Sequence, residues 1–398
     1  MVHRCTYLSR PRPRFFVDRE HEIEEISNIL MSGGNVMLLG LRGYGKSALS
    51  ARIAEILESK GMQTLYIDCL KIVDPDSLMR ETVRDLKSMG RHEVDFPKGL
   101  DAREALDVFF EFLFNNNFGV LVLDEITALL KRFGEFRPFK PIGGAKAVAG
   151  YIKDYFDSPK LSILASDTSI GAVYDLVLEY SSPLLKSFQR VIFLNPLKIS
   201  DAETMLMKVM KTRNKRIRKE VARFVAQQVF GVPQYIIFIG YALPDNPTIS
   251  EAQETLIEEL LYGTLNVYFN LFLEKFSSEQ KAILYAISRG ARTYSAISKQ
   301  FTSVNTIRAL KDLVKANIVR KVDKGRKRVT YSIYDKVFET WLKLKEFPEL
   351  RKETIQRILL SSLSFESYIR EILYSLRQDR EIEDAKGDKL VIPKLERV

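Results

Sequence analysis

The chain has few of the residues that build disulfide frameworks or zinc sites. Its 398 residues include two cysteines, Cys5 and Cys69, which are not spaced as metal ligands, and three scattered histidines. This favours reduced thiols in a cytoplasmic protein and argues against structural zinc. No apolar run approaches the ~20 residues that span a bilayer, and the basic N-terminus lacks the apolar stretch of a secretory signal. We therefore expect no membrane partner.

Positive charge is distributed unevenly along the chain. The net charge is +10, yet residues 1–270 hold 34 Lys and Arg against 34 Asp and Glu. Residues 275–330 hold 14 basic residues against 3 acidic ones. A basic segment of this kind favours a polyanionic partner, although a solvated charged surface would give the same composition.

The first half of the chain alternates short apolar runs with helical patterns. The runs have the length of buried strands, and the segments between them have the apolar spacing of helices. The expected strands are at 35–39, 64–68, 119–124, 161–165 and 191–194. This alternation predicts a parallel sheet that is covered by helices on both faces.

The second half contains helical patterns until a short hairpin. We expect helices at 201–212, 217–230, 233–243 and 250–275, the first of them opened by a capping box at Ser200 and Glu203. A second capping box, at Ser277 and Gln280, begins a new unit. This unit has helices at 279–289, 294–301 and 303–316, then strands at 318–323 and 328–333. That order is typical of a winged helix-turn-helix, and helices at 336–345 and 351–378 follow it.

A glycine-rich loop follows the first expected strand. Residues 40–47 read G-x-x-x-x-G-K-S, between a strand and a helix. Glycines let successive backbone N–H groups converge on phosphate oxygens, and the helix N-terminus faces the same anion. We expect Lys46 to reach the β- and γ-phosphates of ATP and the Ser47 hydroxyl to bind Mg²⁺. The expected nucleotide contacts of the loop are Gly40, Arg42, Gly43, Tyr44, Gly45, Lys46, Ser47 and Ala48.

The strand at 119–124 ends in two adjacent carboxylates, Asp124 and Glu125. Asp124 is expected at the carboxyl edge of the sheet, where it would hold Mg²⁺ together with Ser47. Glu125 would orient or deprotonate the attacking water. We therefore expect hydrolysis of ATP to ADP, with Lys46, Asp124 and Glu125 as catalytic residues.

At this point the chain resembles the archaeal P-loop ATPase family, a branch of the STAND NTPases related to AAA+ proteins. The resemblance is carried, in order, by residues 16–20, 39–42, 122–125, 181–184, 194–197 and 231–233. It implies a five-stranded core and a helical lid that hold a nucleotide between them as an ATP-driven switch. It also implies that Phe16, Val17 and Arg19 lie near the adenine, and that Pro233 in the lid lies near the nucleotide.

The resulting fold class is α/β: a P-loop NTPase core with a parallel sheet, a helical lid and a C-terminal winged helix-turn-helix domain. The expected domains are the core at 1–198, the lid at 199–276, the winged helix domain at 277–345 and a helical tail at 346–398.

Two positions depart from the family pattern. The family usually has Gly-Ser after the fourth strand, where a polar group senses the γ-phosphate, and here Ser166 and Asp167 occupy these positions. The family also tends to have an arginine shortly after the Pro-Leu pair at 183–184, where this chain has Lys186, with Arg190 further on. The resemblance therefore leaves the sensor and arginine-finger roles unassigned, and slow hydrolysis is expected.

The expected winged helix carries the basic excess. In the helix at 303–316, we expect Ile307, Leu310, Leu313 and Val314 to form the buried face. The other face could enter a major groove, and the basic hairpin after it could follow DNA phosphates. The expected DNA contacts are Asn305, Thr306, Arg308, Lys311, Lys324, Arg326, Lys327 and Arg328.

The first hypothesis is thus an ATP-dependent switch that binds double-stranded DNA. One alternative is a STAND-type signalling ATPase that has protein partners or associates with itself, with the winged helix as a docking module. Another is an Orc1/Cdc6-like replication initiator, which usually has an arginine on the lid near the nucleotide; the expected helix at 233–243 has none. A small-molecule kinase has the least support, because no acceptor site is visible.

Overall fold

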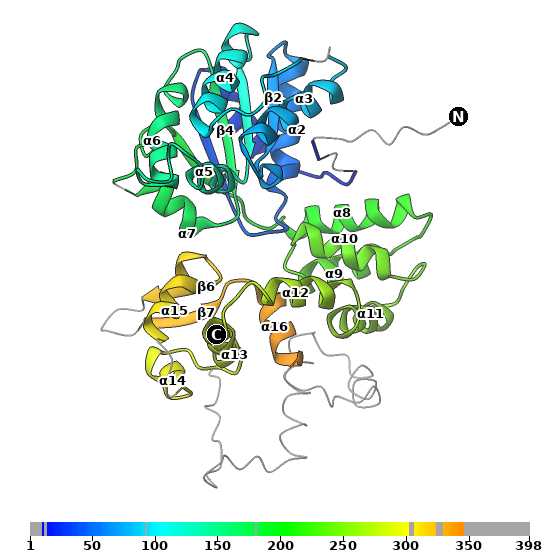
Figure 1. The fold of residues 1–398 in the computed structure, drawn as a ribbon. Coiled ribbons are helices and arrows are strands. Elements are labelled where there is room, and N and C mark those ends of the chain that lie inside the picture. Colours follow the sequence, from blue (N-terminus) through cyan, green and yellow to red (C-terminus); the bar gives the residue numbers. More distant parts are fainter. Residues whose placement is uncertain are drawn as a thin grey trace.

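The computed structural model describes residues 10–11, 14–91, 94–179, 181–301, 306–323 and 329–345. Figure 1 shows a core around a parallel sheet, a group of helices beside it, and a smaller lobe of helices with a hairpin. The expected tail at 346–398, including its helix at 351–378, lies outside the described residues. The domain limits given above remain predictions.

The core contains the predicted parallel sheet. Its strands are β1 (Val36–Leu39), β2 (Thr64–Asp68), β3 (Val120–Asp124), β4 (Ser162–Asp167) and β5 (Arg190–Phe193), in the spatial order β2-β3-β4-β1-β5. All four strand pairs are parallel. The register places Leu39 opposite Asp167, and Asp124 opposite Ser166. The carboxyl ends of β1, β3 and β4 therefore meet at one edge of the sheet.

Both faces of this sheet are covered, as its apolar strands predict. Alternate residues of β1 point to opposite faces, so Val36 and Leu38 belong to one apolar cluster while Met37 and Leu39 belong to another. The first cluster packs against α1 (Glu20–Met31) and α2 (Lys46–Ser59). The second packs against α3 (Pro75–Ser88), α4 (Ala102–Asn115), α5 (Ile126–Gly134) and α6 (Ala145–Phe156).

The helices after the core differ from expectation in two places. They are α8 (Ile199–Thr212), α9 (Lys219–Gln228), α10 (Pro233–Ala242), α11 (Ile249–Leu261) and α12 (Thr264–Leu273). The expected helix at 250–275 is two helices, because the chain turns at Gly263. The capping box at Ser200 is also wrong: α8 begins at Ile199, so Ser200 is already helical, and Glu203 is buried beside Lys219 at 3.7 Å.

The last lobe has the predicted winged helix order. It contains α13 (Ser278–Ser288), α14 (Tyr294–Ser298), α15 (Thr306–Lys315), β6 (Val319–Asp323), β7 (Val329–Ile333) and α16 (Lys336–Lys345). The expected capping box at Ser277 and Gln280 is formed. Trp341 of α16 is buried against Phe269 of α12, with 5.6 Å between the ring centroids, so the winged helix is packed onto the preceding helices.

The turn between α9 and α10 depends on a glycine. Gly231 has φ +67°, its carbonyl accepts a hydrogen bond from Leu197 N at 3.0 Å, and an added Cβ would lie 2.2 Å from Leu197 O. We expect Gly231→Ala to lower the free energy of unfolding by roughly 3 kcal/mol, through left-handed backbone strain plus the clash. Gly61→Ala is the matched control, because Gly61 has φ +87° with open space around it. If chemical denaturation showed equal losses of unfolding free energy in the two variants, the clash with Leu197 would not contribute.

Among the described residues, no helix is both long enough and apolar enough to cross a membrane.

Candidate functional site

A cavity of about 900 Å³ lies at the carboxyl edge of the sheet, between the P-loop and α10. Its wall contains eleven of the expected nucleotide contacts together with both carboxylates of the β3 end. These are Phe16, Val17, Arg19, Arg42, Gly43, Tyr44, Gly45, Lys46, Ser47, Ala48, Pro233, Asp124 and Glu125. The fold therefore brings residues that are far apart in the sequence to the wall of one cavity.

Gly40 is the expected contact that does not line the cavity. It lies behind the loop, where an added Cβ would come 2.9 Å from Leu194 O. Further along, Gly43 and Gly45 have φ values of +87° and +93°, conformations that favour glycine. These two positions give the loop its curvature, and Gly40 lets it start close to β5.

Lys46 is held at the centre of this loop. Its side chain is buried, and its Nζ donates to Gly40 O at 2.8 Å and to Thr168 Oγ1 at 3.0 Å. Burial lowers the pKa of Lys46, while Glu125 and Asp124 oppose that shift. A buried ammonium group that is held by neutral acceptors can exchange them for an anionic ligand such as a phosphate.

Asp124 is oriented by two hydroxyl groups. Tyr66 Oη donates to Asp124 Oδ2 at 2.8 Å, and Ser166 Oγ donates to Asp124 Oδ1. Ser47 lies in the wall of the same cavity. No group of three or more His, Cys, Asp or Glu among the described residues could hold a metal. A hydroxyl and a carboxylate nevertheless fit Mg²⁺, which usually takes few protein ligands and completes its shell with water and phosphate oxygens.

Glu125 is held by a residue that sequence reasoning missed. Thr168 donates its N–H to Glu125 Oε2 at 3.0 Å and its hydroxyl to Glu125 Oε1. The same hydroxyl accepts from Lys46, so Thr168 links the two charged groups. The signal in the sequence was a polar residue just after the fourth strand. It was obscured because β4 runs two residues beyond the expected end, to Asp167.

Asp167, whose position suggested a sensor but whose role the sequence left unassigned, does not face the cavity. Asp167 is fully buried and does not line the cavity. Its carboxylate accepts hydrogen bonds from Thr127 N at 2.8 Å and Ser169 N at 2.7 Å, so it fixes the chain behind the site. Burial, with a smaller effect of Glu125, raises the pKa of Asp167 to about 6. The physical reason is strand alternation: Thr168, the next residue, is the one directed into the cavity wall.

The raised pKa gives a pH-dependent prediction. A carboxyl group whose pKa is higher in the folded chain than in the unfolded chain stabilises the folded state at low pH. This contribution to the free energy of unfolding is lost as pH rises from about 4 to about 6. We expect the difference in unfolding free energy between wild type and Asp167→Asn to fall by roughly 2 to 3 kcal/mol between pH 4 and pH 7. Urea denaturation at several pH values measures it. A difference that is constant across this range would show that Asp167 is ionised throughout.

Apolar side chains also line the cavity. They come from the segment before α1, from the connection between β5 and α8, and from α8 and α10: Phe15, Phe16, Val17, Leu197, Met205, Pro233 and Ile237. Arg19 is also in the wall, but its guanidinium donates to Asn195 O at 2.6 Å and to Glu22 at 2.9 Å. Arg19 therefore fixes the segment in place, with φ +75°, and its charge is already engaged.

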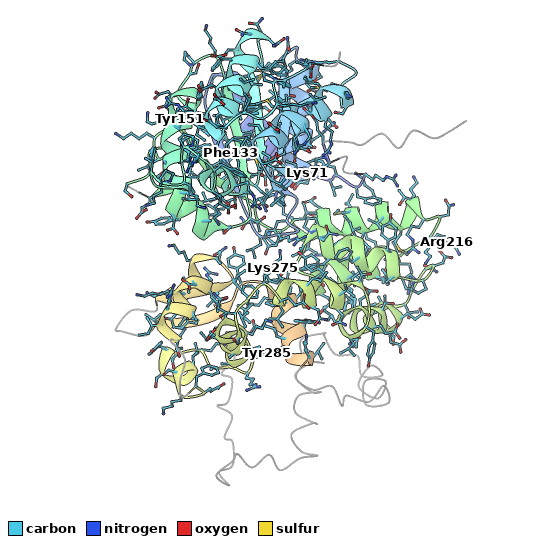
Figure 2. The ribbon with its side chains drawn as sticks, in the orientation of Figure 1. Lys71, Phe133, Tyr151, Arg216, Lys275 and Tyr285 are labelled. Carbon is cyan, nitrogen blue, oxygen red and sulfur yellow. The ribbon has the colours of Figure 1, made fainter. Side chains whose placement is uncertain are left out.

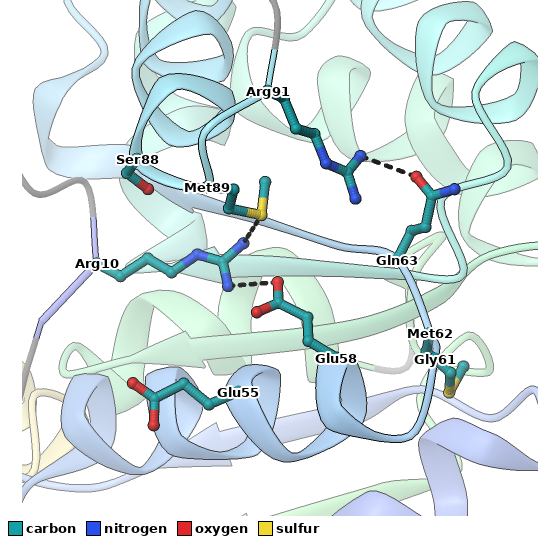
Figure 3. Close-up of a pocket in the computed structure, with 9 residues that line it drawn as sticks. All are labelled: Arg10, Glu55, Glu58, Gly61, Met62, Gln63, Ser88, Met89 and Arg91. Atoms are coloured by element: carbon teal, nitrogen blue, oxygen red, sulfur yellow. Dashed lines mark hydrogen bonds and ion pairs between the residues drawn. The ribbon is translucent and has the colours of Figure 1, made fainter.

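Arg10 secures the same segment from its other end. Its guanidinium binds Asp85 at 2.8 Å and Glu58 at 2.7 Å, which joins residues 10–11 to α2 and α3. Arg10 and Glu58 border a smaller hollow, of about 450 Å³, in which Arg10 reaches Glu58 and Met89 (Figure 3). This hollow contains no residue of the P-loop or of the carboxylate pair. We interpret it as a structural clamp beside the nucleotide cavity.

The lid contacts the P-loop directly. Gln234, the second residue of α10, donates its N–H to Gly43 O at 3.2 Å. The cavity residues that α8 and α10 supply, Met205, Pro233, Gln234 and Ile237, are all uncharged. Lys186 and Arg190 do not line the cavity, and Arg190 pairs with Glu25 at 2.7 Å. Neither Lys186 nor Arg190 is therefore placed to act as an arginine finger on the cavity of its own chain.

The expected DNA contacts are placed only in part. Asn305, Lys324, Arg326, Lys327 and Arg328 lie outside the described residues. Arg308 and Lys311 are on the exposed face of α15, as expected. Thr306 is a correction: it is 5% exposed, whereas Ile307, expected inside, is 52% exposed. The buried face is Thr306, Ala309, Leu310 and Leu313; these four residues recur at helical spacing, so Thr306 and Ala309 continue the stripe that contains Leu310 and Leu313.

Two family models match the sequence. An ATPase domain predominantly from Archaea matches residues 16–238, and a probable winged helix domain matches residues 266–344. No curated protein matches the chain.

Solved structures share the fold. A Walker-type ATPase of Pyrococcus abyssi is 21% identical over 84% of this chain and 98% of that chain, with a TM-score of 0.65. The ORC2 protein of Aeropyrum pernix, in ADPNP and ADP complexes, is 14% identical over 84% of this chain and 98% of that one, with a TM-score of 0.53. Because the ATPase model covers more than half of the sequence, this chain belongs to the archaeal ATPase family and carries a C-terminal winged helix domain.

Proposed function

We propose that the chain is an ATP-hydrolysing switch that binds DNA through its winged helix. The observation that carries the ATP part is the single cavity that collects Lys46, Ser47, Asp124 and Glu125 between a P-loop and a lid. The membership of an ATPase family supports it. The apolar side chains of the cavity suit a nucleotide base, and its charged side chains suit the phosphates.

The chemistry follows from these side chains. The P-loop N–H groups and Lys46 bind the β- and γ-phosphates, while the metal ion, held by Ser47 and Asp124, would neutralise phosphate charge. Glu125 accepts the proton of the attacking water, and Thr168 orients the carboxylate by its two hydrogen bonds. Water would attack the γ-phosphorus, the bond from the γ-phosphorus to the bridging oxygen would break, and the products would be ADP and inorganic phosphate.

The DNA part rests on the winged helix and its charge. Arg308 and Lys311 are exposed near the start of α15. The other end of this helix lies against the core: Lys315 pairs with Asp175 at 2.5 Å, and an added Cβ at Gly171 of α7 (Ile170–Val173) would lie 2.2 Å from Lys315 O. Figure 1 shows α7 above α15. We infer that DNA approaches α15 on the side of the exposed Arg308 and Lys311.

Fluorescence anisotropy with labelled duplex DNA tests this part. We expect binding that weakens steeply as salt increases, with each lost phosphate contact reducing the slope of log K against log salt by about 0.9. The variant Arg308→Ala/Lys311→Ala should lose about two such contacts, by the same relation. Lys131→Ala/Lys140→Ala, which removes two exposed charges from the core, is the matched control and should bind as wild type does.

A second candidate is supported by the α7–α15 contact. A winged helix that is docked on its own core suits a signalling ATPase whose partners are proteins. In that case the anisotropy experiment would show no binding at low salt in any nucleotide state. Breaking the Lys315–Asp175 pair would then change nucleotide exchange without creating affinity for DNA.

A further inference from the structure

One cation of the nucleotide cavity comes from the chain beyond α10, in the region that matches the winged helix model. Lys275 lines the cavity together with Lys46, Glu125 and Thr168. Within the described part of the chain, it is the only lining residue beyond Ile237. It lies in the short connection between α12 and α13, inside the region that matches the winged helix model. Figure 2 shows Lys275 between the core and the lobe below it.

The helix that precedes Lys275, α12, is held against the P-loop. The guanidinium of Arg42 lies over the ring of Tyr268 in α12, 5.6 Å from its centroid. The Tyr268 hydroxyl would be 3.8 Å from a Cβ added at Gly43. Tyr235 of α10 packs edge-on against the same ring at 6.0 Å. The position of Lys275 is therefore tied to the loop that binds phosphate.

The charge of Lys275 has no partner in the described structure. Its side chain makes no ion pair or side-chain hydrogen bond among the described residues. Partial burial lowers its pKa, Arg42 lowers it further and Glu125 raises it, so its ammonium group is within electrostatic reach of both sides of the cavity. Helices α8 and α10, in contrast, contribute no charged side chain to this wall.

We propose that Lys275 binds the terminal phosphate of ATP and thereby makes the winged helix segment distinguish ATP from ADP. This inference rests on the proposed function, because it requires a nucleoside triphosphate in the cavity. A cation at this place gains a charge-assisted contact in the ATP state that ADP cannot supply. Differential affinity of this kind is what a nucleotide switch needs, since equal binding to both states would move nothing.

The test compares nucleotide affinities of the full-length chain. Binding of a non-hydrolysable ATP analogue with Mg²⁺, and of ADP with Mg²⁺, is measured for wild type, Lys275→Met and Lys275→Arg. Lys281→Met, on the neighbouring helix and outside the cavity, is the matched control. We expect Lys275→Met to weaken the ATP analogue about tenfold and ADP less than about twofold, with Lys275→Arg close to wild type.

A second readout follows the segment itself. Trp341 is the only tryptophan of the chain, and its Nε1 donates to Asn266 of α12 at 2.9 Å. The ATP analogue, but not ADP, should change its fluorescence in wild type, and Lys275→Met should lose this response. If Lys275→Met binds both nucleotides as wild type does, or weakens both equally, the inference is overturned and the proposed function stands. If wild type binds neither nucleotide, both are overturned.

Discussion

The variant Glu125→Gln is expected to bind ATP and to hydrolyse it at least ~100-fold more slowly than wild type, because it lacks the base that takes the proton from water. Glutamine keeps the size of the side chain, and its oxygen can still accept a hydrogen bond from Thr168, which donates to both oxygens of the glutamate. The amide cannot accept a proton near neutral pH. Phosphate release measured under saturating ATP gives the rate, and equilibrium binding gives the affinity.

The matched control for this variant is Glu55→Gln. Glu55 is an exposed residue of α2, paired with Arg52 at 3.1 Å, and it does not line the nucleotide cavity. It should hydrolyse ATP at the wild-type rate. If Glu125→Gln also kept that rate, Glu125 would not be the base, and the assignment of this site to hydrolysis would lose its main residue.

Replacing the P-loop lysine should affect binding rather than only the rate. Lys46 is 5% exposed and is the buried cation at the centre of the loop. Lys46→Met keeps the apolar stem and removes the charge, so we expect affinity for both ATP and ADP to fall at least ~100-fold, or about 2.7 kcal/mol. Isothermal titration with each nucleotide measures the loss.

Lys60→Met serves as the control for this change. Lys60 is exposed at the other end of the same helix and lies outside the nucleotide cavity. Loss of affinity in both variants would indicate damage to α2 rather than to a phosphate contact. Unchanged affinity in Lys46→Met would mean that the loop does not hold phosphate in the proposed way.

The two variants separate two roles that lie close together. Glu125→Gln should change the rate with little change in affinity, whereas Lys46→Met should change affinity for ATP and ADP alike. Lys275→Met should affect ATP alone. The three variants would therefore give three different results. These would identify Glu125 as the base, Lys46 as a ligand of phosphates that ATP and ADP share, and Lys275 as a ligand of the terminal phosphate.

Much of the core could be predicted because its signals are local. The apolar strands and the glycine loop are short contiguous patterns, and a parallel sheet necessarily brings strand ends such as Asp124 to one edge. The winged helix order was likewise readable from helix caps and a hairpin. Domain limits and the contacts made by the site residues remain predictions.

What could not be predicted depends on contacts between distant segments. Thr168 was missed because β4 extends to Asp167, and strand ends depend on pairing with β1 and β3 rather than on propensity. Lys275 has no local motif, since only the packing of α12 on the P-loop brings it to the cavity. Thr306 and Ile307 exchanged their expected faces: the buried stripe of α15 runs through Thr306, Ala309, Leu310 and Leu313, and apolar character alone pointed to Ile307 instead.

The central claim is that the nucleotide state controls the affinity for DNA. The most direct measurement is the dissociation constant of Glu125→Gln for duplex DNA at fixed salt, with ATP and Mg²⁺ in one series and ADP and Mg²⁺ in the other. Blocking hydrolysis keeps the ATP state throughout the titration. A switch predicts that the two constants differ by at least about fivefold. Equal constants in the two states would contradict it, whatever their absolute value.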